Sequence, residues 1–305
     1  MSERALPIAI APRKPAPYLL EAVRAGGGSL VSIETAQALI WNAFSAEELR
    51  DLLAGAPGIT WVQLPSAGIE RYAGIVGDGR IWTCAKGIYA DSVAEHALAL
   101  ALAGLHRLPQ CARARHWERA TGRDLQGGAV TILGGGGIAA RLIELLQPFS
   151  PRITVVRRHP APMDGVERVL ATKDLPDALA DADIVVLALA LTPPTAGIIG
   201  APELRRMKND AWLVNIGRGK LVKTDDLVAA LRDGIIGGAA LDVTDPEPLP
   251  DGHPLWELDN CLITPHSANP PQPQHAALAR LVGENVRRRI AGEELLGLVN
   301  ADLGY

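Results

Sequence analysis

The segment "AVTILGGGGIAARLIELLQPFSPRITVVRRHP", residues 129–160, constrains the fold of this chain more than any other. An apolar run leads into four consecutive glycines, which are followed by a helical pattern and a second apolar run. Gly134, Gly136 and Ala139 match G-x-G-x-x-[G/A] in the strand–turn–helix context that this pattern requires. The segment therefore predicts a βαβ unit, in which a helix joins two parallel strands.

The residue types in this turn suit one kind of ligand. The first glycine permits the tight turn, the second lets backbone N–H groups approach a pyrophosphate, and the small Ala139 lets helix and strand pack closely. The N-terminus of the helix adds a partial positive charge. We interpret the glycines as the phosphate-binding loop of a dinucleotide site rather than as a flexible connection.

Short β-like runs alternate with helical patterns along the whole chain, which favours parallel α/β layers. Ser45 is placed to cap one helix, and Ser92 with Glu95 forms a predicted capping box that opens the helix over residues 91–107. The expected strands, in chain order, are "PIAIA", "SLVSI", "ALIW", "TWVQL" and "IWTC", then "AVTIL", "ITVVR", "IVVLALA", "AWLVNI", "GAALDV" and "CLIT". The last six have the rhythm of a six-strand dinucleotide-binding sheet.

The fold prediction is an α/β protein with two Rossmann-like domains. A doubly wound, parallel-sheet cofactor domain, residues 97–271, is inserted in a smaller flavodoxin-like substrate domain, residues 1–96 plus 272–305. The substrate domain is expected to be discontinuous because the last helical stretch, residues 274–291, would cross back onto it.

Composition excludes several classes of protein. With 305 residues, 48% hydrophobic and 21% charged, the chain is long and apolar enough for a globular core. A net charge of −4 gives no electrostatic case for nucleic acid or a membrane surface as a partner. Three cysteines without a CxxC spacing indicate neither disulfides nor a metal site. No signal peptide or membrane span is expected, and we expect a cytoplasmic protein.

Further motifs occur downstream, in the order "LPSAGIERY", "KGIYADSVAEHALALAL", the glycine loop, "LTPPTAGII" and the series "NIGRG…LDV…EP…TPH". Together they cover nearly the whole chain, and the final series is far more specific than a glycine loop. The sequence resembles the D-isomer-specific 2-hydroxyacid dehydrogenase family. That resemblance implies a hydride transfer between a nicotinamide cofactor and a small 2-keto acid or D-2-hydroxy acid. It also implies a homodimer formed through the cofactor domain.

The resemblance assigns roles to particular residues. The catalytic set that it implies is Arg218, Glu247 and His266. The implied cofactor-binding residues are Gly134, Gly136, Gly137, Ile138, Arg157, Arg158, Thr192 and Asp242, the last near the nicotinamide amide. The implied substrate-binding residues are Ser66, Ala67 and Gly68, with Lys86 and Gly87 opposite, and Arg218.

Two positions depart from the family pattern. Gly137 stands where an arginine is usual, which weakens one possible phosphate contact. Lys223 replaces an acid that is common after the "GRG" motif, and this change is expected to be structural. Neither departure touches the catalytic set.

The chemistry of a keto-acid reductase fits these side chains. Imidazole suits proton transfer near neutral pH, so His266 would protonate the carbonyl oxygen. A carboxylate bonded to it, Glu247, would fix the tautomer and stabilise the imidazolium. Arg218 offers a planar fork that matches a carboxylate, which Lys cannot reproduce. His253 in "GHPLW" is the best rival to His266, but its Pro-rich turn favours a role in the fold.

The end of the second strand of the βαβ unit bears on the choice of cofactor. An acid at this place bonds the ribose hydroxyls of NAD, but the sequence has Arg157 and Arg158. Guanidinium groups pair with a 2′-phosphate, so NADP(H) is the preferred prediction and NAD(H) remains possible.

The sequence thus predicts an NADPH-preferring reductase of the glyoxylate/hydroxypyruvate type. A D-3-phosphoglycerate dehydrogenase-like enzyme is one alternative, although a chain ending at Tyr305 is expected to lack the regulatory domain often appended there. A non-catalytic, cofactor-sensing binding protein of the same fold is another. A methyltransferase with the same glycine loop would prefer an acid at position 157 and leaves the "TPH" segment unexplained.

Overall fold

The computed structural model describes residues 5–117, 119 and 121–300 and contains two separate parallel β-sheets. The chain divides into two compact units. Unit 1 comprises Met1–Tyr89 and Pro270–Tyr305, and unit 2 comprises Ala90–Asn269. The chain therefore leaves unit 1 between residues 89 and 90, seven residues before the expected boundary at 96, and re-enters it at 270.

Unit 1 has a five-stranded sheet in the order β2-β1-β3-β4-β5, which is the 2-1-3-4-5 order of flavodoxin-like folds. Its strands are β1 (Pro7–Ala11), β2 (Ser29–Leu30), β3 (Ala38–Trp41), β4 (Trp61–Gln63) and β5 (Ile81–Thr83). Its α-helices are α1 (Pro17–Ala25), α2 (Ala46–Ala54) and α9 (Pro271–Ala291). Ser45 caps α2 as predicted, since its side chain accepts a hydrogen bond from the Glu48 N–H at 3.1 Å.

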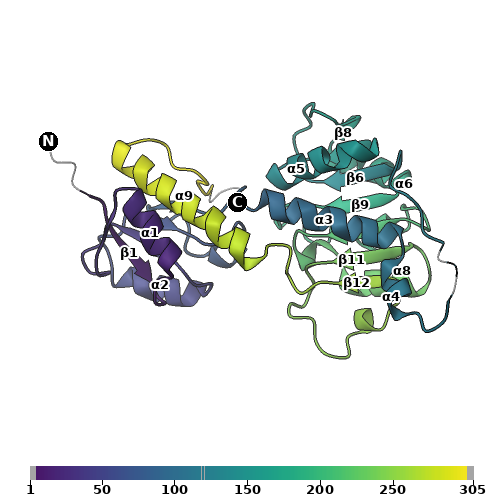
Figure 1. Ribbon diagram of the computed structural model, residues 1–305, viewed down its shortest axis with the longest axis horizontal. Helices are drawn as coiled ribbons and strands as arrows, with labels where there is room; N and C mark the ends of the chain where they lie inside the picture. Colours follow the sequence, from purple (N-terminus) through teal and green to yellow (C-terminus); the bar gives the residue numbers. More distant parts are fainter. Residues whose placement is uncertain (1–4, 118, 120, 301–305) are drawn as a thin grey trace. The chain divides into compact units, whose positions relative to one another are not determined.

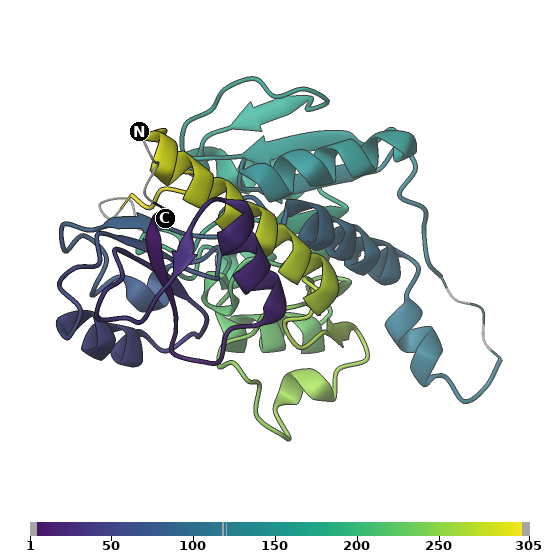
Figure 2. The same ribbon diagram turned by 60° about the vertical axis from the view of Figure 1, so that its left-hand side comes forward.

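The two faces of this sheet are covered by different helices. Ile8 of β1 packs with Val23 of α1 and with Val282 and Val286 of α9. Figures 1 and 2 both show α9 lying along α1, although the two helices are about 250 residues apart in sequence. On the other face, α2 and residues such as Trp41 form a second apolar cluster. The C-terminal helix is thus part of the core of unit 1.

Unit 2 has a seven-stranded sheet in the order β12-β11-β10-β9-β6-β7-β8, in which every pairing is parallel. Its strands are β6 (Ala129–Leu133), β7 (Arg152–Val156), β8 (Arg168–Leu170), β9 (Ile184–Leu187), β10 (Trp212–Asn215), β11 (Gly238–Leu241) and β12 (Cys261–Ile263). Its α-helices are α3 (Ala90–Leu105), α4 (Leu108–Arg113), α5 (Gly137–Leu146), α6 (Leu175–Ala180), α7 (Ala201–Leu204) and α8 (Thr224–Arg232). The α/β fold class predicted from the sequence is confirmed.

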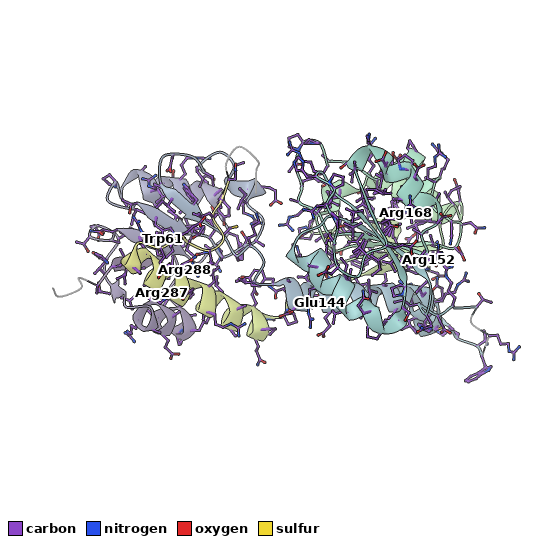
Figure 3. All side chains as sticks on the ribbon, turned by 90° about the horizontal axis from the view of Figure 1, so that it is seen from above. Trp61, Glu144, Arg152, Arg168, Arg287 and Arg288 are labelled. Atoms are coloured by element: carbon purple, nitrogen blue, oxygen red, sulfur yellow. The ribbon has the colours of Figure 1, made fainter. Side chains whose placement is uncertain are left out.

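Two details of unit 2 differ from the sequence prediction. The sheet has a seventh strand, β8, on its edge; Figure 3 labels Arg168 of β8 and Arg152 of the neighbouring β7. This strand is only three residues long and begins with an exposed arginine, so it has no apolar run to reveal it. The predicted capping box is wrong, because α3 begins at Ala90 and Ser92 and Glu95 lie inside the helix.

Helices cover both faces of the larger sheet, as a doubly wound fold requires. Helices α3 and α5 pack side by side on one face (Figure 1). Helices α6, α7 and α8 pack on the other, around Leu179, Leu204 and Leu227. Because both faces are covered, most residues of the strands are apolar, and β6, β9, β10 and β11 are buried at every residue.

Candidate active site

The glycine loop lies between β6 and α5, at the carboxyl end of β6, an interior strand of the seven-stranded sheet. Gly134 has φ +114°, and a Cβ there would collide with the carbonyl oxygen of Ala188, so only glycine fits. Gly136 caps α5, and a Cβ there would meet no atom within 4 Å. The first-turn amides, including those of Gly137 and the half-buried Ile138, point out of the helix without an intrahelical acceptor.

This geometry fits the pyrophosphate of a dinucleotide. The loop is sharply turned, its backbone amides are available at a helix N-terminus, and the space beside Gly136 holds no protein atom. Ala139 is fully buried, so its small side chain lets α5 approach the sheet closely.

Arg157 and Arg158 follow β7 directly, beside the glycine loop. The Arg157 N–H donates to the Leu170 carbonyl at 3.0 Å, which fixes its backbone. Its side chain crosses the loop, since a Cβ built on Gly135 would lie 3.0 Å from its Cδ and Nε. Among the described residues, neither guanidinium makes a hydrogen bond or an ion pair. Two unneutralised cations therefore stand where the adenosine ribose of a dinucleotide is held in this fold.

Thr192 lies in the loop that follows β9, the strand next to β6. Its N–H donates to the Thr195 hydroxyl at 2.7 Å, and that hydroxyl donates to the Ala190 carbonyl at 2.8 Å. The turn is thus held by its own threonines, and it keeps Thr192 near the carboxyl end of β9.

The three predicted catalytic residues follow neighbouring strands of unit 2. Arg218 comes after β10, Glu247 lies in the loop after β11, and His266 comes after β12. His266 Nδ1 lies 2.7 Å from Glu247 Oε1, so the predicted hydrogen-bonded pair is present. Both side chains are about half exposed, which leaves the imidazole open to a ligand. His266 has φ +50°, a left-handed conformation that few non-glycine residues adopt.

Arg218 is held by a turn at residues 215–219, which the sequence motifs do not predict. The buried side chain of Asn215 donates to the Arg218 carbonyl at 2.9 Å and accepts from the Gly217 N–H at 3.1 Å. The Arg218 guanidinium donates through Nη1 to the Gly217 carbonyl at 2.7 Å. A Cβ at Gly219 would collide with the Thr244 carbonyl, so this glycine lets the Arg218 turn lie against the loop that leads to Glu247.

Asp242 follows β11 and holds the segment that carries His266. Its Oδ1 accepts from the Thr264 hydroxyl at 2.6 Å and the Ser267 N–H at 2.9 Å, and its Oδ2 accepts from the Ala268 N–H at 3.1 Å. Burial raises the pKa of Asp242, but hydrogen bonds with His96, Thr264 and the two amides outweigh burial and lower the pKa to about 2. The carboxylate is therefore charged and clamps the backbone on both sides of His266.

His96 of α3 completes this clamp and was missed as a site residue. Its Nε2 lies 3.0 Å from the Thr264 hydroxyl and 3.3 Å from Asp242 Oδ1. In the sequence His96 is one polar residue in an apolar helix, and its partners are 146 and 168 residues away. Its periodicity on α3 gives no signal of this contact.

The expected substrate-binding segments lie in unit 1. Ser66, Ala67 and Gly68 follow β4, and Lys86 and Gly87 follow the neighbouring β5. The Ala85 N–H donates to the Ser66 carbonyl at 2.9 Å, which joins the two segments, and Gly87 has φ +83°. The structure thus brings the two substrate segments together in unit 1, whereas the catalytic set belongs to unit 2.

Other candidates have structural roles. His253, the rival of His266, caps the short 3-10 helix Pro254–Trp256 by accepting from the Leu255 N–H at 3.3 Å. Lys223 is the N-cap residue of α8 and makes no side-chain cap, and its stem packs against Gly197 and Gly200. Within the described residues, no three His, Cys, Asp or Glu side chains gather as metal ligands, and no helix is long and apolar enough to cross a membrane.

Comparison with known proteins agrees with this geometry. Residues 96–268 match the family model described as "D-isomer specific 2-hydroxyacid dehydrogenase, NAD binding domain". An uncharacterized protein of Corynebacterium melassecola is 41% identical over 302 residues, covering 95% of this chain and 98% of that protein. The human glyoxylate reductase/hydroxypyruvate reductase is 34% identical over 217 residues, covering 68% of this chain and 66% of that protein.

A solved structure extends the likeness to the whole fold. The D-isomer specific 2-hydroxyacid dehydrogenase from Xanthobacter autotrophicus Py2, in complex with NADPH and MES, superposes with a TM-score of 0.86. It is 28% identical, and the match covers 99% of each chain. The fold and the glycine loop define an NAD(P)-binding oxidoreductase. The chain belongs to the D-isomer specific 2-hydroxyacid dehydrogenase family, which confirms the resemblance seen in its motifs.

Proposed function

We propose that this protein is an NADPH-preferring reductase of small 2-keto acids, such as glyoxylate or hydroxypyruvate, and forms D-2-hydroxy acids. The observation that carries the proposal is the His266–Glu247 pair, 2.7 Å apart, in the same unit as a glycine loop flanked by Arg157 and Arg158. The name of the human relative, glyoxylate reductase/hydroxypyruvate reductase, supports the substrate class.

Each member of the catalytic set has a distinct task in this proposal. Glu247 accepts the Nδ1–H of His266 and so directs Nε2 towards the substrate. His266 Nε2 gives its proton to the keto oxygen as the carbonyl is reduced. Arg218 holds the substrate carboxylate and the keto oxygen with its guanidinium fork. NADPH, when bound, supplies the hydride that the keto carbon accepts and is left as NADP⁺.

The cofactor preference follows from charge. A 2′-phosphate carries nearly two negative charges, and the two cations beside the glycine loop have no acidic partner among the described residues. The solved Xanthobacter relative contained NADPH, which agrees with this preference. Glycine loop residues and Ile138 would hold the pyrophosphate, while Thr192 and Asp242 lie towards the nicotinamide half of the site.

The proposal includes a homodimer formed through unit 2. Leu108 of α4 is 52% exposed and Trp117 is fully exposed. Figure 2 shows α4 projecting beyond the end of α3, at the edge of unit 2. Large apolar side chains on a projecting segment suit burial against a second copy. Light scattering should therefore give twice the mass of one chain, and Trp117→Ser should shift the equilibrium towards the monomer.

The experiment that tests the function is a panel of 2-keto acids assayed with NADPH and with NADH. We expect glyoxylate and hydroxypyruvate to be reduced, with a lower KM for NADPH than for NADH. Raising the salt concentration should increase the KM for NADPH more than that for NADH, because only the former depends on the 2′-phosphate. Failure to reduce any 2-keto acid would refute the enzyme assignment and favour a cofactor-sensing protein. Activity confined to 3-phosphoglycerate oxidation would favour the phosphoglycerate dehydrogenase alternative.

A further inference from the structure

Tyr89 connects the two backbone segments that the proposed function assigns to the substrate. It is the last residue of unit 1 before the chain passes into unit 2. Its hydroxyl donates to the carbonyl oxygen of Pro65 at 2.8 Å. Pro65 immediately precedes Ser66, and Tyr89 comes two residues after Gly87. One hydrogen bond therefore joins the start of the Ser66–Gly68 loop to the end of the Lys86–Gly87 segment.

This bond is the second of two braces between the segments. The first is the Ala85 N–H, which donates to the Ser66 carbonyl at 2.9 Å. Between the two braces the chain passes through Gly87, whose φ of +83° lets it turn and whose Cα has no neighbouring atom in the direction of a Cβ. A segment with this conformational freedom needs fixing at both ends, and the Tyr89 hydroxyl fixes the far end.

The surroundings of Tyr89 make this donor permanent. Burial raises the pKa of Tyr89 to about 12, despite a hydrogen bond with the Gln274 side chain that lowers it. The phenol is therefore protonated throughout the working range of an enzyme. Gln274 lies in the first turns of α9, close to the point where the chain re-enters unit 1 at Pro270. Tyr89 thus links the substrate segments to both places at which the chain passes between the units, residues 89–90 and residues 269–270.

We propose that Tyr89 is a positioning residue for the 2-keto acid. Its hydroxyl holds the Ser66–Gly68 loop and the Lys86–Gly87 segment at a fixed separation. This inference rests on the proposed function, because it needs these segments to bind the substrate carboxylate. Two backbone segments and the Lys86 ammonium can meet one carboxylate together only if their spacing is set beforehand. Tyr89 itself does not touch the substrate in this proposal.

The test compares Tyr89→Phe with Tyr18→Phe in the full-length protein. Tyr89→Phe keeps the buried ring and removes the hydroxyl. Tyr18→Phe is a matched control: it keeps the ring that stacks on His275, with centroids 4.5 Å apart, and removes a hydroxyl that makes no hydrogen bond within the described part of the chain. For each variant we would measure kcat and KM for glyoxylate, the Kd of oxalate for the NADPH-loaded protein, the Kd of NADPH, and Tm.

We expect Tyr89→Phe to raise the KM for glyoxylate and the Kd of oxalate by about 3- to 10-fold, the range that the loss of one net hydrogen bond allows. The kcat and the Kd of NADPH should stay within about 2-fold, because His266 and the glycine loop are untouched. Tyr18→Phe should leave all five measured quantities unchanged.

Three results would overturn the inference. The KM for glyoxylate and the Kd of oxalate could be unchanged in Tyr89→Phe, or both variants could raise them equally, which would indicate general packing. A matching loss of NADPH affinity and Tm would indicate a purely structural role. A parent protein that neither reduces a 2-keto acid nor binds oxalate would instead refute the proposed function itself, so the two failures are distinguishable.

Discussion

Replacing Asp242 by Asn should destabilise the protein in a pH-dependent way. One pKa unit corresponds to about 1.4 kcal/mol, so lowering the pKa of Asp242 from 3.8 to about 2 contributes about 2 kcal/mol to the free energy of unfolding at neutral pH. The folded-state pKa is below the unfolded one, so this contribution is fully present above about pH 4 and is lost as the pH falls towards 2. The asparagine side chain does not titrate and lacks this contribution.

The hydrogen-bond geometry of Asp242 adds a second loss of unfolding free energy in the variant, and this loss does not depend on pH. Both carboxylate oxygens of Asp242 accept hydrogen bonds, whereas the Asn amide has a single acceptor oxygen. At least one donor, either the Thr264 hydroxyl or the Ala268 N–H, would face an NH₂ group. A buried donor left without its acceptor costs about 1–3 kcal/mol. The expected difference between the parent protein and the variant is therefore about 3–5 kcal/mol at pH 7. It should shrink by about 1 kcal/mol at pH 3 and by about 2 kcal/mol as the pH approaches 2.

Urea unfolding followed by far-UV circular dichroism, at several pH values between 7 and 3, measures this difference. Asp251→Asn is a suitable control, because Asp251 is exposed and its carboxylate makes no hydrogen bond in the portion of the chain that the structure describes. A loss of stability that is equal at pH 7 and pH 3, or smaller than about 0.5 kcal/mol at pH 7, would refute the reasoning that the carboxylate acts as a charged clamp.

Four further substitutions test the catalytic residues, the cofactor site and the start of α8. His266→Ala should lower kcat by about two to four orders of magnitude while NADPH still binds, and near-normal turnover would contradict the acid–base role. Arg218→Lys should lower kcat/KM for every 2-keto acid, since the fork is lost; equal performance would show that charge alone suffices. Arg157→Asp should weaken NADPH binding by about 10- to 100-fold and spare NADH, as calorimetry can measure. Lys223→Asp supplies the missing cap of α8 and should raise the free energy of unfolding by about 0.5–2 kcal/mol; an unchanged Tm would count against it.

Most of the fold could be predicted because parallel strands covered on both faces are continuous apolar runs. Each of the eleven expected runs overlaps an observed strand, from β1 at Pro7–Ala11 to β12 at Cys261–Ile263. The exception is β8, an edge strand whose pairing with β7 depends on the neighbouring strand rather than on its own composition. The start of α3 differs from the prediction because a capping residue type does not by itself fix where a helix begins. Ser92 can cap a helix, but the backbone is already helical at Ala90.

The candidate site was predictable only where a motif marks it. Gly134 and His266 are marked by sequence patterns, and the backbone angles show why those patterns exist. Supporting residues such as His96, Asn215 and Tyr89 carry no such mark. Their partners are set by how loops meet after the chain has folded, and for His96 the contact spans 168 residues. Local propensity and periodicity contain no information about such contacts.

The discontinuity of unit 1 has a consequence for the synthesis of the protein. The first 89 residues leave the ribosome without α9, so the sheet face that Val282 and Val286 cover stays open while the 180 residues from 90 to 269 are made. At bacterial or eukaryotic translation rates this interval lasts roughly 10–40 s. Unit 2 is continuous in the chain and is complete before α9 emerges. A nascent chain ending near residue 269 therefore contains the whole sequence of unit 2 but only part of unit 1, and during that interval β1 and β3 are the segments exposed to chaperones.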